Sequence, residues 1–192
     1  MAPAFDQARA PYDALFASCR FLPSRIGDIA AQRSRLLGGK ARYRQAATRT
    51  GVPWWFIGTI HAVESGFSFA RHLHNGDPLT ARTVHVPSGR PAVWNPPSDW
   101  VSSAVDALHF QGFAGAEDWS LARTLYRLEG YNGWGYRRST IAINSPYLWS
   151  FSTHYKAGKF VADGRYDPKA ISKQCGAACL LKALQQASDI SF

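Results

Sequence analysis

The chain has 192 residues, of which 46% are hydrophobic, 14% aromatic and 18% charged, and its formal net charge is +9. This length and composition fit one globular domain with a sizeable core, and they exclude a largely disordered chain. The positive charge indicates an anionic partner. However, the Lys and Arg residues are scattered, and the sequence has no basic helix, zinc-finger spacing or Gly-rich phosphate loop, so we expect no nucleic-acid partner.

The cysteines and the apolar runs bear on the compartment. The odd number of cysteines (Cys19, Cys175 and Cys179) argues against a complete disulfide framework, and we interpret them as small buried residues. No run approaches the roughly 20 apolar residues of a membrane span, and MAPAFDQARAPYDALF lacks the basic start and apolar run of a signal peptide. We therefore expect a monomer made in the bacterial cytoplasm, without stable membrane association.

Helical spacing of apolar residues dominates the first third of the chain. A helix over 54–65 reads WWFIGTIHAVES and is apolar on nearly every face until His61 and Glu64, which is typical of a buried helix. The other predicted helices span 5–20, 26–37, 41–48, 98–110, 119–129 (capped at Asp118) and 168–187.

Two segments between these helices have another texture. Residues 67–99 are rich in Gly, Pro, His, Asn and Thr, and we expect loops and a small β-hairpin with Ser88-Gly89 at its turn. Residues 130–167 predict an ordered surface loop region. The fold class is therefore mainly α (α+β), as a single domain over 1–192 with N-terminal helices in 1–38 and the core in 39–192.

Glu64 is the strongest candidate for chemistry. A carboxyl group at the end of a buried apolar helix is costly to ionise, so we expect its pKa to be raised. Such a group can hold a proton near neutrality and act as general acid on a glycosidic oxygen. The alternative is a surface or salt-bridged glutamate that merely ends a helix.

Two motifs carry a family resemblance. The run YRQAATRTGVPWWFIGTIHAVESGF (43–67) resembles the first motif of the goose-type lysozyme and lytic transglycosylase superfamily. The later EGYNGWGY (129–136) is similar to its Tyr-Asn-Gly motif. The segments 71–91 and 145–167 resemble a branch found in phage and prophage endolysins.

The resemblance implies a lysozyme-like helical fold with a small β-hairpin lining a cleft, and an enzyme that cleaves the β-1,4 bond between N-acetylmuramic acid and N-acetylglucosamine. Glu64 maps onto the catalytic acid, and Tyr131 and Asn132 map onto a neighbouring sugar subsite. Ser65 belongs to the Glu-Ser-Gly motif and is taken as a substrate-binding residue. The Gly-Leu-Met-Gln-like stretch of the family is replaced by HLHNGDPLTART, so transglycosylase chemistry does not transfer directly.

Asp77 is the candidate second carboxylate, for stabilising positive charge or activating water, with Thr80 and Thr83 helping to hold the water. Because Asn75 and Gly76 precede it, Asp77 is alternatively a residue that shapes a turn. A lytic transglycosylase would not need Asp77, since the substrate's own hydroxyl closes on the sugar.

Further candidates surround the cleft that the resemblance implies. His72 and His74 have the His-x-His spacing of some metal ligands, but a third ligand is hard to find, so we expect hydrogen bonding to sugar or backbone and no metal or cofactor. Polar aromatic residues suited to sugar binding include Tyr147 and Trp149. Glu129 is a further carboxylate before this cluster, and its alternative is a simple helix-end residue.

These residues predict a peptidoglycan hydrolase, an endolysin that reaches the bacterial cell wall after release or delivery. The open alternatives are a lytic transglycosylase giving 1,6-anhydromuramyl products, a zinc-dependent wall peptidase and a wall-binding module without activity.

Overall fold

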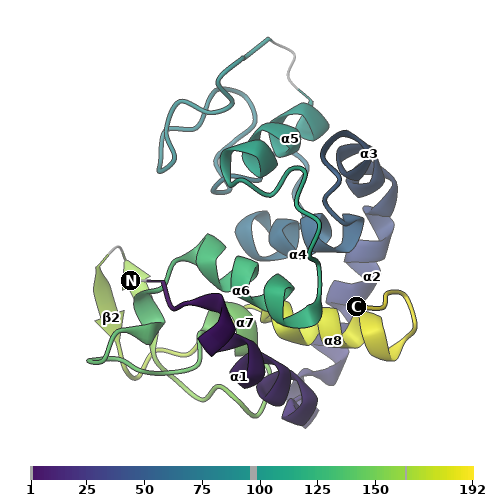
Figure 1. Cartoon of the computed structure of the whole chain (residues 1–192). Coiled ribbons are helices and arrows are strands. Elements are labelled where there is room, and N and C mark those ends of the chain that lie inside the picture. Colours follow the sequence, from purple (N-terminus) through teal and green to yellow (C-terminus); the bar gives the residue numbers. More distant parts are fainter. Residues whose placement is uncertain (1, 96–98, 163) are drawn as a thin grey trace. The chain divides into compact units, whose positions relative to one another are not determined.

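The computed structural model describes residues 2–95, 99–162 and 164–192. Within these residues it has eight α-helices and one two-stranded antiparallel sheet (Figure 1). The predicted class, mainly helical with one small hairpin, is confirmed at this level. No helix of the described part of the chain is long and apolar enough to cross a membrane.

The chain divides into two compact units. The central unit is Ser34–Asp118, and the terminal unit combines Met1–Arg33 with Trp119–Phe192. The border between them falls within α2 (Ile26–Gly38). Each unit is described separately below, and the single domain expected from the sequence stays a prediction.

The central unit is built on α4 (Trp54–Ser65), which packs on α3 (Lys40–Thr50), while α3 also packs on α5 (Trp100–Phe110). Eight consecutive residues of α4, from Trp55 to Ala62, are buried, as its apolar sequence predicts. Gly58 allows close packing, since a Cβ there would lie 2.9 Å from Leu36 Cγ. The bounds of α4 are the predicted ones.

The terminal unit joins the two ends of the described chain. Helix α1 (Phe5–Ser18) packs on α6 (Leu121–Asn132), α6 on α7 (Pro146–Trp149), and α7 on α8 (Ala177–Gln186). Strands β1 (Lys159–Ala162) and β2 (Arg165–Asp167) form the hairpin. Short 3₁₀ helices occupy Pro23–Arg25 and Gly135–Arg137.

The hairpin lies in another place than predicted. Around Ser88-Gly89 the described residues form a turn, with Gly89 at φ 74°, but no strand ladder. Pro87 and Pro91 flank this turn and lack the N–H group that a ladder needs. The hairpin forms instead at β1 and β2, inside the segment for which we expected only loops.

Several helix ends also differ from the prediction: α1 ends at Ser18 instead of residue 20, α3 covers Lys40–Thr50 instead of 41–48, and α6 covers Leu121–Asn132 instead of 119–129. Ser120, and not Asp118, is the N-cap residue of α6. Helix α8 begins at Ala177 because residues 168–176 are irregular, and the Asp167 carboxylate accepts the N–H groups of Lys169 and Ala170 at 2.8 and 3.2 Å. The predicted start of the fifth long helix at Ser98 lies outside the described residues, and α5 begins at Trp100.

Candidate active site

The C-terminal end of α4 places Glu64 at the edge of the core of the central unit. The helix is buried up to Ala62, whereas Glu64 and Ser65 are half-buried. The helix ends at Gly66, whose φ of 57° is left-handed and whose N–H donates to the Ala62 carbonyl. The predicted helix is therefore confirmed, with Glu64 in its last turn beyond the buried stretch, and the catalytic role of Glu64 stays a prediction.

The end of α4 is fixed by polar contacts. The Ser65 hydroxyl donates to the His61 carbonyl at 3.1 Å, and Arg35 Nη2 donates to the Gly66 carbonyl at 2.6 Å. The Gly66 carbonyl lies beyond the helix and gains Arg35 as a partner, while the Ser65 hydroxyl adds a bond to the His61 carbonyl, which also accepts from Phe67 N–H. The hydroxyl proton of Ser65, a residue predicted to bind substrate, thus goes to a backbone hydrogen bond at the end of α4.

His61 lies one turn before Glu64 and is fully buried. Its Nδ1 hydrogen-bonds to Tyr43 Oη at 2.8 Å, and its ring packs on Phe69 and Trp100 with centroids 4.6 and 4.7 Å away. Burial lowers the pKa of His61 to about 4, a shift that the nearby Ser68 backbone opposes only in part. The helical turn before Glu64 therefore carries a neutral imidazole that packs on aromatic rings.

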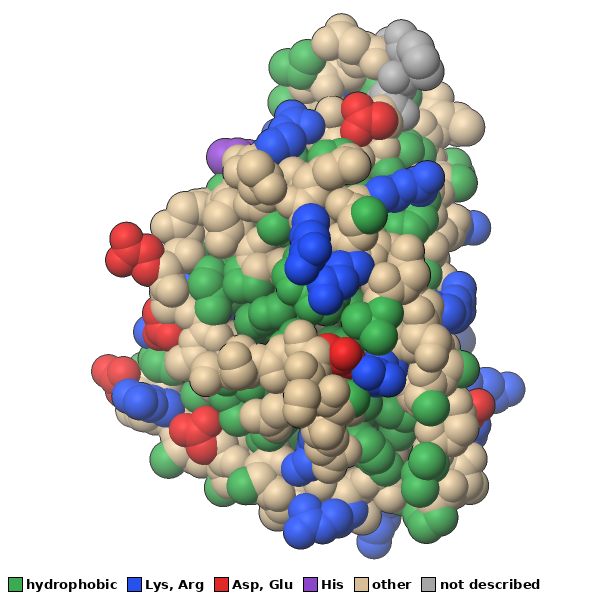
Figure 2. All heavy atoms as spheres, turned by 90° about the vertical axis from the view of Figure 1, so that its right-hand side faces the viewer, with side chains coloured by type: hydrophobic (Ala, Val, Ile, Leu, Met, Phe, Trp, Pro, Cys, Tyr) green, Lys and Arg blue, Asp and Glu red, His purple; other side chains and the backbone are tan. Residues whose placement is uncertain are grey.

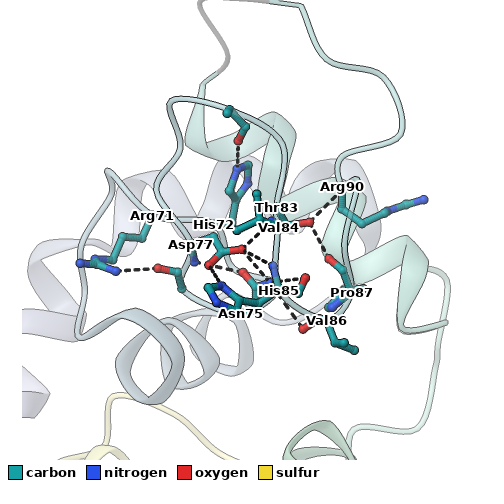
Figure 3. Close-up of polar contacts among 12 residues, drawn as sticks. Arg71, His72, Asn75, Asp77, Thr83, Val84, His85, Val86, Pro87 and Arg90 are labelled. Carbon is teal, nitrogen blue, oxygen red and sulfur yellow. Dashed lines mark hydrogen bonds and ion pairs between the residues drawn. The ribbon is translucent and has the colours of Figure 1, made fainter.

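Residues 71–78, which we name the Glu64 loop, pack directly against the backbone of Glu64. A Cβ at Gly76 would lie 2.6 Å from the Glu64 carbonyl oxygen, and Gly76 has a φ of 78°. The loop closes on itself through His72 N–H to Asp77 O at 2.8 Å and Arg71 Nη1 to Gly76 O at 2.7 Å (Figure 3). Only glycine fits at this contact, so position 76 brings Asp77 to the end of α4.

The Asp77 carboxylate is surrounded by donors of its own chain. Oδ2 accepts from the backbone N–H groups of Val84 at 2.8 Å and His85 at 3.0 Å, and from Asn75 Nδ2 at 3.2 Å. Oδ1 lies 2.7 Å from His85 Nδ1, and Figure 3 shows Asp77 at the centre of these contacts. The predicted alternative role, shaping a turn, is the one this geometry displays; the catalytic role stays a prediction.

The electrostatics of Asp77 agree with that arrangement. Burial acts to raise its pKa, but hydrogen bonds from the His85 backbone and ring and from Val84 N–H outweigh it and lower the pKa to about 2. Asp77 is therefore an anion throughout the neutral range. It cannot serve as an acid there.

His72 and His74 are buried and point into the protein. His72 has both ring nitrogens engaged, Nδ1 with Ser103 Oγ at 2.6 Å and Nε2 with the Ala81 carbonyl at 2.7 Å. His74 Nε2 lies 2.8 Å from Asp106 Oδ2. Both histidines tie the loop to α5, and in this arrangement neither of His72's nitrogens is available to a metal.

Among the residues that the structure describes, no group of three or more His, Cys, Asp or Glu side chains gathers as a metal site. The geometry therefore gives no support to the zinc peptidase alternative.

Thr83 and Thr80 differ in their surroundings. Thr83 is buried and closes the turn that contains Gly89: its hydroxyl donates to the Pro87 carbonyl and accepts from Arg90 N–H at 2.9 Å. Thr80 is exposed. Of the two threonines predicted to hold water, only Thr80 thus lies at the surface.

Asp106, on α5, was missed by sequence reasoning. Arg90 donates two hydrogen bonds to its carboxylate, Nε to Oδ2 at 2.9 Å and Nη2 to Oδ1 at 2.7 Å, and His74 Nε2 lies 2.8 Å from the same Oδ2. A lone carboxylate on the otherwise apolar helix WVSSAVDALHF was a usable signal, because a charge on such a helix needs a partner. His85, the partner of Asp77, gave no such signal.

The predicted residues of the Tyr-Asn-Gly motif lie in the terminal unit, at the end of α6. Asn132 is exposed and lines a pocket of about 410 Å³ together with Trp134, Arg138 and Phe160. Tyr131, beside it, is half-buried. The pocket offers an amide, a guanidinium and aromatic rings, which are groups that bind sugars and carboxylates.

The other predicted residues of this unit lie deeper. Tyr147 is half-buried, but Trp149 is only 1% exposed, so its ring packs in the core. Glu129 is 3% exposed; it accepts two hydrogen bonds from Arg137, at 2.9 and 2.8 Å, and one from the Tyr12 hydroxyl. Arg137 and Tyr12 thus hold the Glu129 carboxyl group in place, and Glu129 and Trp149 both belong to the lining of a pocket of about 400 Å³.

The surface charge is dispersed. Figure 2 shows Lys and Arg side chains in separate groups among hydrophobic and uncharged surface on the face drawn.

In comparisons with known proteins, no family model, no curated protein and no solved structure matches the chain.

Proposed function

We propose that this chain is a peptidoglycan glycosidase with a lysozyme-like fold, and that Glu64 is its general acid. The observation that carries the proposal is the half-buried carboxylate at the end of a buried helix, with the Glu64 loop packed on its backbone. The resemblance of 43–67 and 129–136 to the goose-type lysozyme and transglycosylase superfamily supports the same role.

In the proposed reaction, Glu64 donates its proton to the oxygen of the β-1,4 bond between N-acetylmuramic acid and N-acetylglucosamine. Cleavage leaves positive charge on the sugar ring. The ring is then attacked either by water, giving a reducing end, or by the substrate's own hydroxyl, giving an anhydro sugar. The net charge of +9 favours approach to an anionic cell wall.

One observation favours the transglycosylase as a second candidate. The oxygens of Asp77 are engaged by Asn75, Val84 and His85. A hydrolase needs a group that activates water, whereas an intramolecular attack does not need Asp77. The two reactions differ in their products and share the role of Glu64.

Purified peptidoglycan digested with wild type, Glu64→Gln and the exposed control Glu117→Gln tests the proposal, with products identified by mass spectrometry. We expect Glu64→Gln to lose activity by about 10²–10⁴-fold, the usual contribution of a general acid, and Glu117→Gln to retain it. Reducing muropeptides identify a hydrolase and anhydromuramyl products a transglycosylase. Equal activity of Glu64→Gln and wild type would overturn the role of Glu64.

A further inference from the structure

Asp77 and His85 form a pair in which the carboxylate is buried and the imidazole is exposed. Asp77 Oδ1 lies 2.7 Å from His85 Nδ1, and the His85 side chain is 80% exposed against 9% for Asp77. A polar contact with so exposed a partner adds little to stability. Asp77 Oδ2 already accepts three hydrogen bonds, from Asn75 Nδ2 and from the N–H groups of Val84 and His85. The turn therefore does not depend on the His85 ring.

The Asp77 carboxylate determines which nitrogen of the His85 ring carries the proton. Burial acts to raise the pKa of Asp77, but hydrogen bonds from His85 and Val84 hold it at about 2, so at neutral pH the Asp77 oxygens only accept. In the neutral imidazole, Nδ1 therefore donates to Asp77 Oδ1, and the lone pair lies on Nε2. Within the described part of the chain, no residue hydrogen-bonds to this Nε2. A carboxylate that orients an imidazole in this way prepares it to act as a base.

The pair is attached to the loop that touches the proposed acid. The Glu64 loop packs on the backbone of Glu64 at Gly76, where a Cβ would lie 2.6 Å from the Glu64 carbonyl oxygen. Asp77 follows Gly76 and binds the His85 ring, and Asn75 precedes Gly76 and donates to the His85 carbonyl at 3.1 Å (Figure 3). His85 is therefore held by both neighbours of the residue that contacts Glu64.

We propose that His85, oriented by Asp77, is the general base that activates water in the glycosidase reaction. This inference rests on the proposed function and gives its hydrolytic form the base that Asp77 itself does not supply. Water attacks the anomeric carbon of N-acetylmuramic acid, and its proton passes to His85 Nε2. The bond from that carbon to the bridging oxygen breaks, and Glu64 gives its proton to this oxygen. One water is consumed, a reducing end forms, and the solvent carries the proton from His85 back to Glu64.

The test is steady-state cleavage of soluble peptidoglycan glycan chains, with products identified by mass spectrometry. His109, an exposed histidine on α5 of the same unit, gives the matched control. His85→Gln should lower kcat by about 10²–10⁴-fold with little change in KM, whereas His109→Gln should behave as wild type, whose products should carry reducing ends. A wild-type kcat for His85→Gln, a loss confined to KM, or anhydromuramyl products from the wild type would each overturn the role of His85.

Asp77→Asn tests the orientation of the base. The asparagine oxygen can still accept from Val84 and His85 N–H, but its amide donates to the ring and forces the proton onto Nε2. We expect a variant that still unfolds cooperatively in urea and whose kcat is reduced as in His85→Gln. A wild-type kcat for Asp77→Asn would show that Asp77 does not orient a base.

Glu64→Gln, measured in parallel, separates this inference from the proposed function. Inactive Glu64→Gln together with fully active His85→Gln would refute the role of His85 alone. Fully active Glu64→Gln would refute the proposed function itself.

Discussion

Replacing Gly76 by alanine tests whether the Glu64 loop must rest on the end of α4. The new Cβ would lie 2.6 Å from the Glu64 carbonyl oxygen, and the residue would have to keep a φ of 78°. The left-handed conformation costs about 1–2 kcal/mol, and forcing an atom into packed backbone costs about 1–3 kcal/mol more. We therefore expect Gly76→Ala to lower the free energy of unfolding by about 2–5 kcal/mol.

Gly89→Ala is the matched control. Gly89 has nearly the same φ, 74°, but a Cβ there meets nothing within 4 Å. It therefore carries only the conformational cost of about 1–2 kcal/mol. Both variants lose the same backbone entropy in the unfolded chain, so this contribution cancels in the comparison.

Urea unfolding of the two variants, followed by the rate of peptidoglycan clearing, gives the answer. Gly76→Ala should be the less stable, and its activity at a temperature where both variants are folded should fall well below that of Gly89→Ala, because the clash displaces Glu64. If the two variants have equal stability and equal activity, the contact between Gly76 and Glu64 does not position the proposed acid.

Two further predictions concern stability. The pKa of His61 in the folded protein is about 4, below the ordinary 6.5. Between these two values the unfolded chain therefore binds a proton on His61 and the folded protein does not. The free energy of unfolding should consequently fall by about 3 kcal/mol between pH 7 and pH 4. His61→Gln should flatten that fall in urea titrations, and an unchanged pH profile would contradict the argument. Arg137→Met leaves the buried Glu129 carboxylate with only Tyr12, so we expect a loss of about 3 kcal/mol, against about 2 kcal/mol for Tyr12→Phe. A wild-type urea midpoint for Arg137→Met would show that this pair does not stabilise the fold.

The strongly periodic parts of the sequence were predictable. The bounds of α4 follow from a run that is apolar all round and ends at Ser65-Gly66, a pattern that leaves little choice of structure. The start of α8 was not predictable from periodicity, because the turn that the Asp167 carboxylate makes competes with helix for the same backbone N–H groups. The turn at Ser88-Gly89 was recognised, but its prolines remove the donors of a ladder.

The candidate site was predictable in part, for a different reason. The position of Glu64 depends on its own helix, and local sequence specifies it. The partners of Asp77 and His74 come from residues 84–85 and from Asp106, up to 32 positions away, and no local pattern announces them. Polar residues that looked available for a ligand, such as His72 and Thr83, are used to hold the loop.

The make-up of the terminal unit has a consequence for synthesis of the chain. The central unit is one continuous segment, Ser34–Asp118, so its helices can pack as soon as that segment leaves the ribosome. Helix α1 is synthesised before its partners, because α6 begins only at Leu121 and the α8 residue Lys182, which binds the end of α1, comes later still. Helix α1 therefore lacks its partners while the residues between Ser18 and Leu121 are synthesised, which makes α1 a segment in need of protection from aggregation and proteolysis in the nascent chain.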